Sequence, residues 1–414
     1  MRLIMPSQIS GAVNPPPSKS LTQRALIAAA LAEGRSTIFN PSDCDDAVAT
    51  IRVIKALGAG IEAREDSIDI DGGGEPKQNT LDCGESGTCM RMITPVAALY
   101  DNEFTITGSG SLMKRPIGMM EYPLTKLGAK VESENGLPPI RITGPIKGGN
   151  VEINGSTTSQ FLSGLLMALP VCKQDSRIRV FNLKSRHYIT LTESALSDFG
   201  VSIQHDEAME HFRIEGNQKY RPMEYEVEGD WSGAAFMLVA GAVAGRIAVE
   251  GLNNDSKQPD RAITDALEKA GADMTIDPEG VTVNQSDLTA FEFDANDCPD
   301  LFPPLAVLAL NCKGTTRIHG AERLRHKESD RAQAILRELG GLGANIKLDG
   351  DTMQITGGRL KGGRMHSHND HRIAMAGAVA ALNSENGVEI SHEECVSKSY
   401  PGFFRDLENI MVKR

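Results

Sequence analysis

Along this chain, segments in which apolar and polar residues alternate are interspersed with segments that are almost entirely apolar. Five segments combine the end of an amphipathic pattern, a glycine, and a short run in which apolar and polar residues alternate; the first is LGAGIEAREDSIDIDG, which begins at Leu57. Their glycines are Gly58, Gly128, Gly200, Gly271 and Gly343, at intervals of 70, 72, 71 and 72 residues. A glycine commonly ends a helix, and alternation is typical of a strand. Each segment therefore predicts the end of a helix followed by a β-hairpin.

A second series of predicted helices is apolar on nearly all sides. AAFMLVAGAVA and IAMAGAVAAL are examples, and helices of this kind are buried. A polar or small residue marks the start of each, at intervals of 67 to 73 residues: Ser20, Gly87, Ser159, Ser232, Asp300 and Asp370. The chain thus reads as six repeats, each with a buried and an outer helix.

These repeats predict an α/β (α+β) fold with two similar domains. Each domain is expected to hold three β-α-β-α-β-β units, with the buried helices inside and the sheets outside. The sixth unit lacks its hairpin, and we expect the strand near residues 2–6 to complete its sheet, so that both chain ends lie in one domain. Helix N-termini carry unpaired N–H groups and attract anions. Six polar helix starts on two facing domains would therefore converge on one anion-binding cleft.

The overall charge excludes some ligand classes. With 43 basic and 55 acidic residues, the chain has a net charge of −12. A nucleic-acid or anionic-membrane binder needs a basic face, so neither is expected. Seven scattered cysteines without a CxxC pair favour a reducing compartment. We see no targeting segment and no apolar run of membrane-spanning length, and we expect a cytoplasmic protein.

The stretch NPPPSKSLTQR carries the first candidate chemistry. It resembles the end of a phosphate-binding P-loop, but three prolines replace the glycines that such a loop needs. Ser20 and Arg24 share a helix face, with Lys19 beside them. A hydroxyl, an ammonium and a guanidinium at one helix start suit a phosphate group. The alternative is a serine-capped helix with a solvated lysine.

Further motifs repeat this pattern of cations at or beside helix starts. They are CGESGTCMR with Arg91, KRPIG with Arg115, STTSQF, RHKESDR with Lys327 and Arg331, NDHRIAM with Arg372, and SKSYPGFF, which is expected to place Lys398 at the start of the last helix. A plain helix entry or a solvated charge run could explain each alone. Together they predict a site for small, multiply charged anions, in which Asp300 and Glu328 are the carboxylates placed to move protons.

One motif also resembles a metal site. His366, His368, Asp370 and His371 spell HxHxDH, a two-metal hydrolase pattern that requires further ligands later in the chain. Only His392 follows, so too few ligands remain and we expect no metal. The repeat gives a simpler interpretation, in which Asp370 caps a buried helix and His371 and Arg372 project into the cleft.

Taken together, SKSLTQRA, GESGTCMR, KRPIG, TSQF, KESDR, NDHRIAM and KSYPGF, in this order and spacing, resemble the EPSP synthase (3-phosphoshikimate 1-carboxyvinyltransferase) family over essentially the whole chain. The resemblance implies an inverse α/β barrel fold with a chain that crosses between domains twice, near Ser20 and near residues 227–231. The expected domains are residues 1–19 with 229–414, and residues 20–228, with the active site in the cleft between them.

The resemblance implies transfer of the enolpyruvyl group of phosphoenolpyruvate to the 5-hydroxyl of shikimate 3-phosphate, with release of phosphate. No metal or organic cofactor is required, and a monomer is expected. Shikimate 3-phosphate would contact Lys19, Ser20, Arg24, Thr158, Ser159, Gln160, Ser185, Tyr188, Asp300, Arg323 and Lys327. Phosphoenolpyruvate would contact Lys19, Gly87, Arg91, Arg115, Gln160, Arg331, Arg372 and Lys398. Catalytic roles would fall to Asp300, Glu328, Lys19, His371 and Lys398.

Three residues depart from the pattern of many family members, and three other functions can be compared with the sequence. Glu85 and Ser86 stand where many members have Asn and Ala, and Arg323 where some have Asn. The nearest alternative is a UDP-N-acetylglucosamine enolpyruvyl transferase, but the loop GSGSLMKRPIG lacks the reactive cysteine typical of that family. A ring-shaped DNA clamp conflicts with the net charge, and a metallohydrolase with the shortage of ligands.

Overall fold

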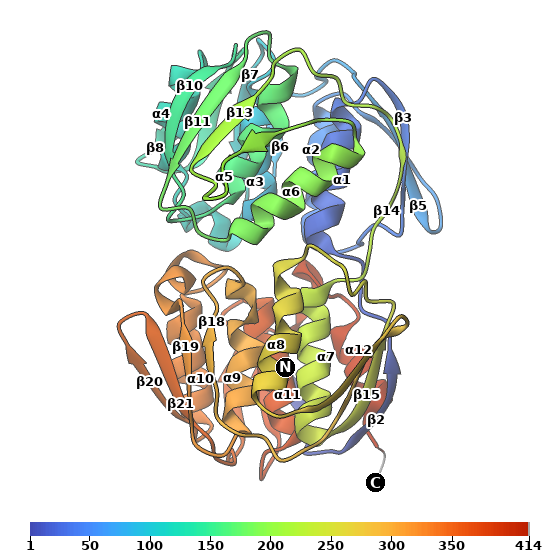
Figure 1. The fold of residues 1–414 in the computed structure, drawn as a ribbon, viewed down its shortest axis with the longest axis vertical. Helices are drawn as coiled ribbons and strands as arrows, with labels where there is room; N and C mark the ends of the chain where they lie inside the picture. The colour runs from blue at the N-terminus through green and yellow to red at the C-terminus, as the bar shows by residue number, and fades with distance from the viewer. Residues whose placement is uncertain (413–414) are drawn as a thin grey trace. The chain divides into compact units, whose positions relative to one another are not determined.

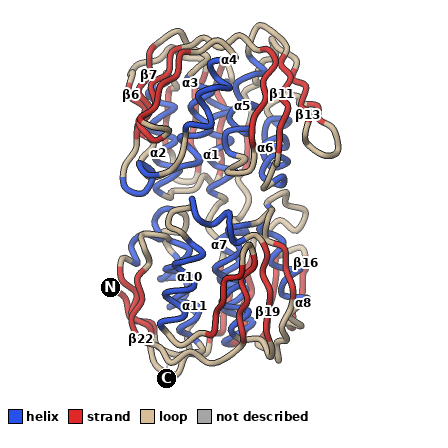
Figure 2. The backbone as a smooth tube through the Cα atoms, turned by 90° about the vertical axis from the view of Figure 1, so that its left-hand side faces the viewer, coloured by secondary structure: helices blue, strands red, loops and turns tan. Residues whose placement is uncertain are grey.

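The computed structural model describes residues 1–412, which divide into two compact units. Unit 1 combines Met1–Ser18 with the chain from Glu228 onward, and unit 2 is Lys19–Val227. In each unit, long helices occupy the inside and small sheets lie outside them (Figures 1 and 2).

Unit 2 contains three four-stranded sheets, whose orders are β14-β3-β5-β4, β6-β7-β9-β8 and β10-β11-β13-β12. Its helices are α1 (Lys19–Leu31), α2 (Asp45–Ala56), α3 (Gly87–Ala97), α4 (Glu121–Lys126), α5 (Gln160–Ala168) and α6 (Arg186–Asp198), with short 3-10 helices η1 (Gly110–Lys114), η2 (Gly118–Met120) and η3 (Leu169–Val171). Its strands are β3 (Gly34–Phe39), β4 (Gly60–Ala63), β5 (Ser67–Gly72), β6 (Thr80–Asp82), β7 (Glu103–Thr107), β8 (Lys130–Glu134), β9 (Leu137–Thr143), β10 (Gly149–Asn154), β11 (Ser176–Phe181), β12 (Gln204–His205), β13 (His211–Ile214) and β14 (Glu224–Glu226).

Unit 1 contains sheets of order β16-β17-β15-β2, β18-β19-β21-β20 and β1-β23-β22. Its helices are α7 (Trp231–Ala244), α8 (Ile263–Lys269), α9 (Phe302–Leu310), α10 (Arg331–Gly341), α11 (His371–Leu382) and α12 (Phe403–Ile410), with η4 (Pro259–Ala262), η5 (Pro299–Leu301), η6 (Ala321–His326) and η7 (Glu393–Lys398). Its strands are β1 (Arg2–Ile4), β2 (Ile9–Val13), β15 (Gly245–Glu250), β16 (Asp273–Asp277), β17 (Gly280–Asn284), β18 (Glu292–Asp294), β19 (Thr315–His319), β20 (Asn345–Asp349), β21 (Thr352–Thr356), β22 (Gly363–His366) and β23 (Val388–Ser391).

The six predicted repeats are confirmed: five are complete β-α-β-α-β-β units, and the sixth lacks the hairpin, as expected. The glycines that mark them adopt positive φ angles at the helix ends, between 76° and 113°, which side chains other than glycine rarely tolerate. The buried helices α1, α3, α5, α7, α9 and α11 form the inside of the units; every residue of α7 is buried. Since each large apolar side chain removed from water contributes about 1.5–3 kcal/mol, these helices supply much of the core's stability.

The sixth sheet is completed as the sequence predicted. Strand β1 pairs antiparallel with β23, with Arg2 opposite Ile390 and Ile4 opposite Val388. The N-terminal segment therefore closes the sheet of the last repeat, and both ends of the described chain belong to unit 1.

The first repeat of each unit takes its first strand from a distant part of the chain, because the strands that precede α1 and α7 have exchanged places. β2 pairs with β15, which follows α7, and β14 pairs with β3, which follows α1. Where the chain leaves unit 1, its two segments pair with each other: Pro17 bridges Gly229, and the Ser18 N–H donates to the Glu228 carbonyl at 2.8 Å. The divisions fall at 18/19 and 227/228, one residue from the boundaries expected from the sequence.

No helix within residues 1–412 is both long enough and apolar enough to span a membrane. All seven cysteines are free thiols and buried.

Candidate functional site

The first group of candidate residues lies on α1 of unit 2. Lys19 begins the helix, and its Nζ lies 3.0 Å from Oδ2 of Asp46 on α2. Gln23, one turn further, donates to Thr50 Oγ1 at 2.9 Å and to Ser86 Oγ at 3.0 Å. Because Gln23 is fully buried, these bonds fix the start of α1 against α2 and the entry to α3.

Arg24 is a buried guanidinium surrounded by neutral acceptors. It donates from Nε to Thr192 Oγ1 at 2.9 Å, from Nη1 to the Ser20 carbonyl at 2.8 Å and from Nη2 to the Tyr188 carbonyl at 3.3 Å. Within residues 1–412 it forms no ion pair with a carboxylate. Burial lowers the pKa of Arg24 to about 10, so the side chain is still a cation at neutral pH. A buried cation without a carboxylate is suited to bind an anionic ligand.

Gly87 allows two arginines to approach the start of α3. A Cβ atom at this position would lie 2.9 Å from Nη1 of Arg91 and 2.9 Å from Nη1 of Arg115. Arg91 also donates to Gln160 Oε1 at 2.8 Å and to the Pro116 carbonyl at 3.2 Å. Arg91 and Arg115 are 4% and 6% exposed, so the structure holds two cations at a helix N-terminus, where an anion is favoured.

The remaining predicted residues of unit 2 stand at the starts of α5 and α6. The Gln160 amide donates to Thr88 Oγ1 at 2.7 Å, and its backbone N–H donates to Thr158 Oγ1 at 3.1 Å, which ties α5 to α3. Ser159 precedes α5 and is buried. Ser185 precedes α6 with φ of 55°, and Tyr188 lies in the first turn of that helix. All the residues predicted for the sugar phosphate in this half of the chain therefore stand at helix starts of one unit.

Glu85 and Ser86, the two departures from the family pattern, have structural partners. The Glu85 Oε2 atom accepts from Ser111 N at 3.1 Å and from Ser111 Oγ at 3.2 Å. Ser86 caps α3, since its Oγ accepts from Cys89 N at 3.2 Å. Both side chains thus help to fix the loops that carry Arg91 and Arg115.

In unit 1, Asp300 gathers three cations. Its Oδ1 lies 3.3 Å from Lys327 Nζ and 2.8 Å from Arg331 Nη1, and its Oδ2 lies 3.2 Å from Arg372 Nη2. Burial opposes ionisation of Asp300, but the positive charges of these cations outweigh it and hold the pKa well below the usual range. Burial also lowers the pKa of Lys327, against the attraction of Asp300.

Arg331 is fully buried and joins three carboxylates. Its Nε donates to Asp370 Oδ2 at 2.9 Å, Nη1 to Asp300, and Nη2 to Glu328 Oε2 at 2.6 Å. Burial opposes the charge of Arg331, but these carboxylates raise its pKa further. Asp370 caps α11 as predicted, since its Oδ1 accepts from Arg372 N at 3.0 Å. Arg331 therefore orients Glu328 and Asp300 relative to each other.

Arg372 connects a histidine to a buried acid that the sequence did not reveal. Its Nη1 lies 2.6 Å from Nε2 of the buried His371, and its Nη2 donates to Ser232 Oγ at 2.8 Å. Ser232 in turn donates to Asp260 Oδ2. Burial and the charge of Asp300 raise the pKa of Asp260 to about 7. The only signal for Ser232 in the sequence was its place in the repeat, and Asp260 had none.

Four cations come from short turns and not from the starts of α-helices. Lys398 ends η7, five residues before α12, so its expected place at the start of the last helix is wrong; its Nζ donates to the Asn369 carbonyl at 2.8 Å. Arg115 and Lys327 follow η1 and η6. Arg323 lies within η6, where its Nη1 donates to the Asn296 carbonyl. The repeat spacing marks the long helices, whereas these 3-10 turns are too short to produce a recognisable pattern in the sequence.

The histidines of the HxHxDH motif do not form a ligand set. The ring centroids of His366 and His392 lie 4.8 Å apart with the rings tilted by 49°, and His368 Nε2 lies 2.6 Å from Glu338 Oε1. Asp370 is bonded to Arg331 and to the backbone of α11. Among residues 1–412 no three His, Cys, Asp or Glu side chains are grouped to hold a metal ion.

Comparison with known proteins gives a consistent result. A profile of the EPSP synthase (3-phosphoshikimate 1-carboxyvinyltransferase) family matches residues 4–407. A curated 3-phosphoshikimate 1-carboxyvinyltransferase of Methanocorpusculum labreanum is 41% identical over 99% of this chain and 98% of the relative. That of Clostridium perfringens is 41% identical over 99% of this chain and 97% of the relative. The solved EPSP synthase of Acinetobacter baumannii has a TM-score of 0.83 at 26% identity and covers 99% of this chain and 98% of its own.

Proposed function

Since the chain belongs to the EPSP synthase family, we infer that it transfers the enolpyruvyl group of phosphoenolpyruvate to the 5-hydroxyl of shikimate 3-phosphate and releases phosphate. It is a transferase of the shikimate pathway, which leads to chorismate and the aromatic amino acids. The observation that carries this inference is that one family profile spans the cationic residues of unit 2 and the acid–base residues of unit 1.

Shikimate 3-phosphate is proposed to bind chiefly to unit 2. Its phosphate would interact with Lys19, Ser20, Ser159 and Arg24, and its ring with Gln160, together with Thr158, Ser185 and Tyr188. Arg24 supports this assignment because its buried charge is matched only by neutral acceptors of the chain. A charge-assisted hydrogen bond to a phosphate contributes about 1.5–3 kcal/mol, more than a neutral one.

Phosphoenolpyruvate is proposed to bind to cations of both units. Arg91 and Arg115 beside Gly87 would hold one end, with Lys19 and Gln160 nearby in unit 2. Arg331, Arg372 and Lys398 of unit 1 would hold the other, and Asp300, Lys327 and Arg323 would contact the sugar. One reaction needs both sets, so we expect the units to bring them together around the substrates and to exclude water.

Proton transfers are assigned to unit 1, with Lys19 of unit 2 assisting. Glu328 protonates the methylene carbon of phosphoenolpyruvate, and the neighbouring carbon becomes electrophilic. The 5-hydroxyl oxygen attacks that carbon, and its proton passes toward Asp300 and Lys327. In the resulting tetrahedral intermediate, Glu328 removes the added proton, the carbon–carbon double bond re-forms, and the bond to the phosphate oxygen breaks. Lys19, His371 and Lys398 stabilise the charge that develops on phosphate.

The geometry of Asp300 restricts its role. Its pKa is held well below the usual range by Arg372, Lys327 and Arg331, so it accepts a hydrogen bond from the hydroxyl but does not keep the proton. Burial lowers the pKa of Lys327, so its ammonium group gives up a proton more readily than an exposed lysine does and can relay the hydroxyl proton away from Asp300. No metal or organic cofactor enters any of these steps.

The enzyme is proposed to act as a monomer in the cytoplasm. Free, buried cysteines suit a reducing compartment. The test of function is phosphate release by the purified protein. Release only when both substrates are present is expected, whereas release from phosphoenolpyruvate alone would contradict the assignment. Turnover of UDP-N-acetylglucosamine in place of shikimate 3-phosphate would identify the alternative transferase.

A further inference from the structure

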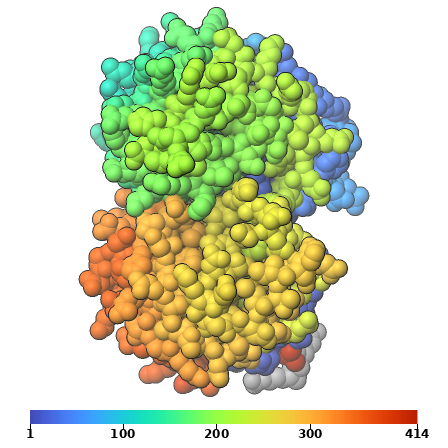
Figure 3. Space-filling model, in the orientation of Figure 1, coloured from blue at the N-terminus to red at the C-terminus, as the bar shows by residue number. Residues whose placement is uncertain are grey.

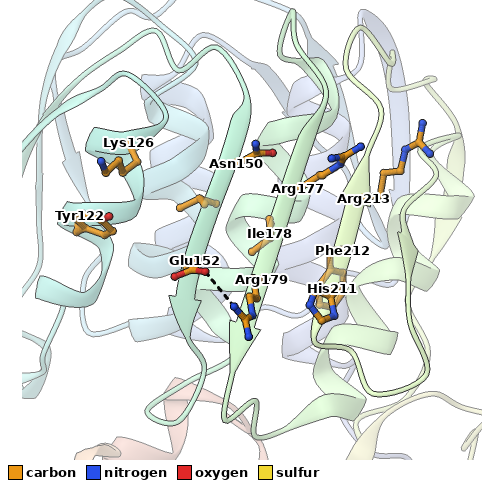
Figure 4. A pocket seen from close by; sticks show the side chains of 11 residues that line it. Tyr122, Lys126, Asn150, Glu152, Arg177, Ile178, Arg179, His211, Phe212 and Arg213 are labelled. Atoms are coloured by element: carbon orange, nitrogen blue, oxygen red, sulfur yellow. Dashed lines mark ion pairs between the residues drawn. The ribbon is translucent and has the colours of Figure 1, made fainter.

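An exposed groove on unit 2, which runs from blue to yellow-green in Figure 3, carries an excess of basic side chains and lies on the outer face of a sheet (Figure 4). Its volume is about 590 Å³, and the side chains that define it are Tyr122 and Lys126 of α4, Arg177 and Arg179 of β11, and His211 and Arg213 of β13. None of these residues belongs to the site proposed above. The groove is therefore a separate feature that the transferase reaction does not explain.

Two arginines in this groove occupy directly opposed strand positions without a counter-ion. Arg177 of β11 lies directly opposite Arg213 of β13 in the antiparallel register. Their other neighbours on the sheet are neutral, Asn150 on β10 and Gln204 on β12. Within residues 1–412, neither guanidinium forms a hydrogen bond or an ion pair. Like charges directly opposite on two strands destabilise a sheet, so this arrangement has a cost.

Arg179 and His211 have acidic partners, and Lys126 lies over the ring of Tyr122, with its Nζ 5.4 Å from the ring centroid. Arg179 lies 3.5 Å from Glu152 Oε1 and stacks on the ring of Phe181 at 4.6 Å. His211 Nδ1 lies 2.8 Å from Asp206 Oδ2. Among the described residues, Arg177 and Arg213 are therefore the arginines of the groove without an acidic partner, and Figure 4 shows them at the same level of adjacent strands.

The other sheets of the chain provide an internal comparison. In unit 2, Glu62 and Asp69 also form a directly opposed like-charge pair, but Arg35 bridges them, with its Nη2 2.5 Å from Glu62 Oε2. Arg141 of β9 lies opposite Glu132. Among the paired strands of residues 1–412, the opposed acidic pair is thus neutralised by a basic side chain, whereas no acidic side chain forms an ion pair with Arg177 or Arg213.

We propose that the groove binds a small phosphate-bearing molecule, with its phosphate between Arg177 and Arg213. Two guanidinium groups can each donate in parallel to phosphate oxygens, which is the preferred geometry for this anion. Tyr122 and Lys126 lie on the far side of Asn150, where they can contact an organic part of the ligand (Figure 4). The volume is that of a small-molecule site. A nucleic acid is disfavoured, because so few cations stand on a protein of net charge −12.

The test counts bound anions by titration calorimetry with two probes, inorganic pyrophosphate and phenyl phosphate. The variant Arg177→Gln/Arg213→Gln removes both guanidiniums. The matched control Arg141→Gln/Arg317→Gln removes the same charge from exposed strand positions on two other sheets. Any probe bound at the transferase site contributes equally to the binding measured for the wild type, the groove variant and the control. Unchanged transferase activity of the variants verifies that they fold.

The groove variant is expected to bind one molecule of probe fewer than the wild type, or to bind it with at least tenfold lower affinity. The control is expected to keep the stoichiometry and the affinity of the wild type. Tighter binding of phenyl phosphate than of pyrophosphate, lost in Tyr122→Ala, would assign the site to an organic phosphate; the reverse order would assign it to inorganic polyphosphate. Identical isotherms for the groove variant and the wild type would overturn the proposal, as would an equal loss in the control. A single-stranded oligonucleotide that binds more tightly than either probe through these arginines would also overturn it.

Discussion

Gly87→Ala tests the proposed phosphoenolpyruvate site most directly. The φ angle of Gly87 is not in the left-handed region, so alanine fits the backbone at the start of α3 without strain. The new methyl group would, however, stand 2.9 Å from a guanidinium nitrogen of both Arg91 and Arg115, closer than the ~3.5 Å of van der Waals contact. The substitution therefore changes the site and leaves the fold intact.

The magnitude follows from the bonds that must change. Arg91 is held by Gln160 at 2.8 Å and by the Pro116 carbonyl at 3.2 Å, so moving its tip sacrifices part of that support. The loss of one charge-assisted hydrogen bond to the substrate corresponds to about 1.5–3 kcal/mol. Since ~1.4 kcal/mol is a factor of ten, KM for phosphoenolpyruvate should rise about 10- to 100-fold. Affinity for shikimate 3-phosphate should change little, because its proposed contacts come from other helices.

Steady-state kinetics with each substrate varied in turn measures this effect, and calorimetry gives the affinity for shikimate 3-phosphate. Gly340→Ala in α10 is the control, because a Cβ atom there would meet nothing within 4 Å. An unchanged KM for phosphoenolpyruvate in Gly87→Ala would refute the assignment of Arg91 and Arg115. A parallel loss of both affinities would indicate a general disturbance of unit 2.

Three further predictions concern unit 1. Glu328→Gln should lower turnover by about 10²–10⁴ while shikimate 3-phosphate still binds, as kinetics and calorimetry would show; an active variant would exclude Glu328 from the proton transfer. Asp260 has a pKa raised to about 7, so its contribution to stability is full at pH below its unfolded value near 4 and is lost as pH rises through 7. The unfolding free energy of the wild type should therefore fall between pH 4 and 8 relative to that of Asp260→Asn. Denaturant unfolding monitored by the fluorescence of Trp231, the single tryptophan, measures this difference, and parallel plots of unfolding free energy against pH for the two proteins would contradict it. Gln258→Ala should reduce the unfolding free energy in the same assay by about 2–4 kcal/mol, because buried polar groups of the two segments that leave unit 1 lose their partner, and an unchanged value would count against that role.

The fold could be predicted because its signal is local and repeated. A glycine that ends a helix, an alternating hairpin and an apolar helix are each recognised within about a turn or a strand of sequence. Their recurrence at about 70 residues turned weak individual signals into a strong one. The same periodicity located the helix starts that carry Lys19, Gly87 and Ser159.

The partners of the site residues could not be predicted, because they come from distant parts of the chain. Gln258 joins Ser18, 240 residues away, to the start of α7, and Arg372 bonds Ser232 across 140 residues. No pattern in the sequence links such pairs. Asp260 was missed for this reason, since a lone aspartate in a short turn is indistinguishable from a solvated one until its neighbours are known.

Arg24 of unit 2 and Arg331 of unit 1 are buried cations with different partners, and this difference suggests a division of labour between the units. In unit 2, the guanidinium of Arg24 meets only carbonyl and hydroxyl groups, so an anionic ligand gains a charge that the protein leaves unmatched. In unit 1, Asp300 and Arg331 are already joined in a network of opposite charges. A ligand there must compete with carboxylates for its cations, but those carboxylates are held in fixed positions by Arg331. We therefore propose that unit 2 chiefly binds the sugar phosphate, whereas unit 1 adds the proton-transfer groups, so that the reaction needs both sets of motifs.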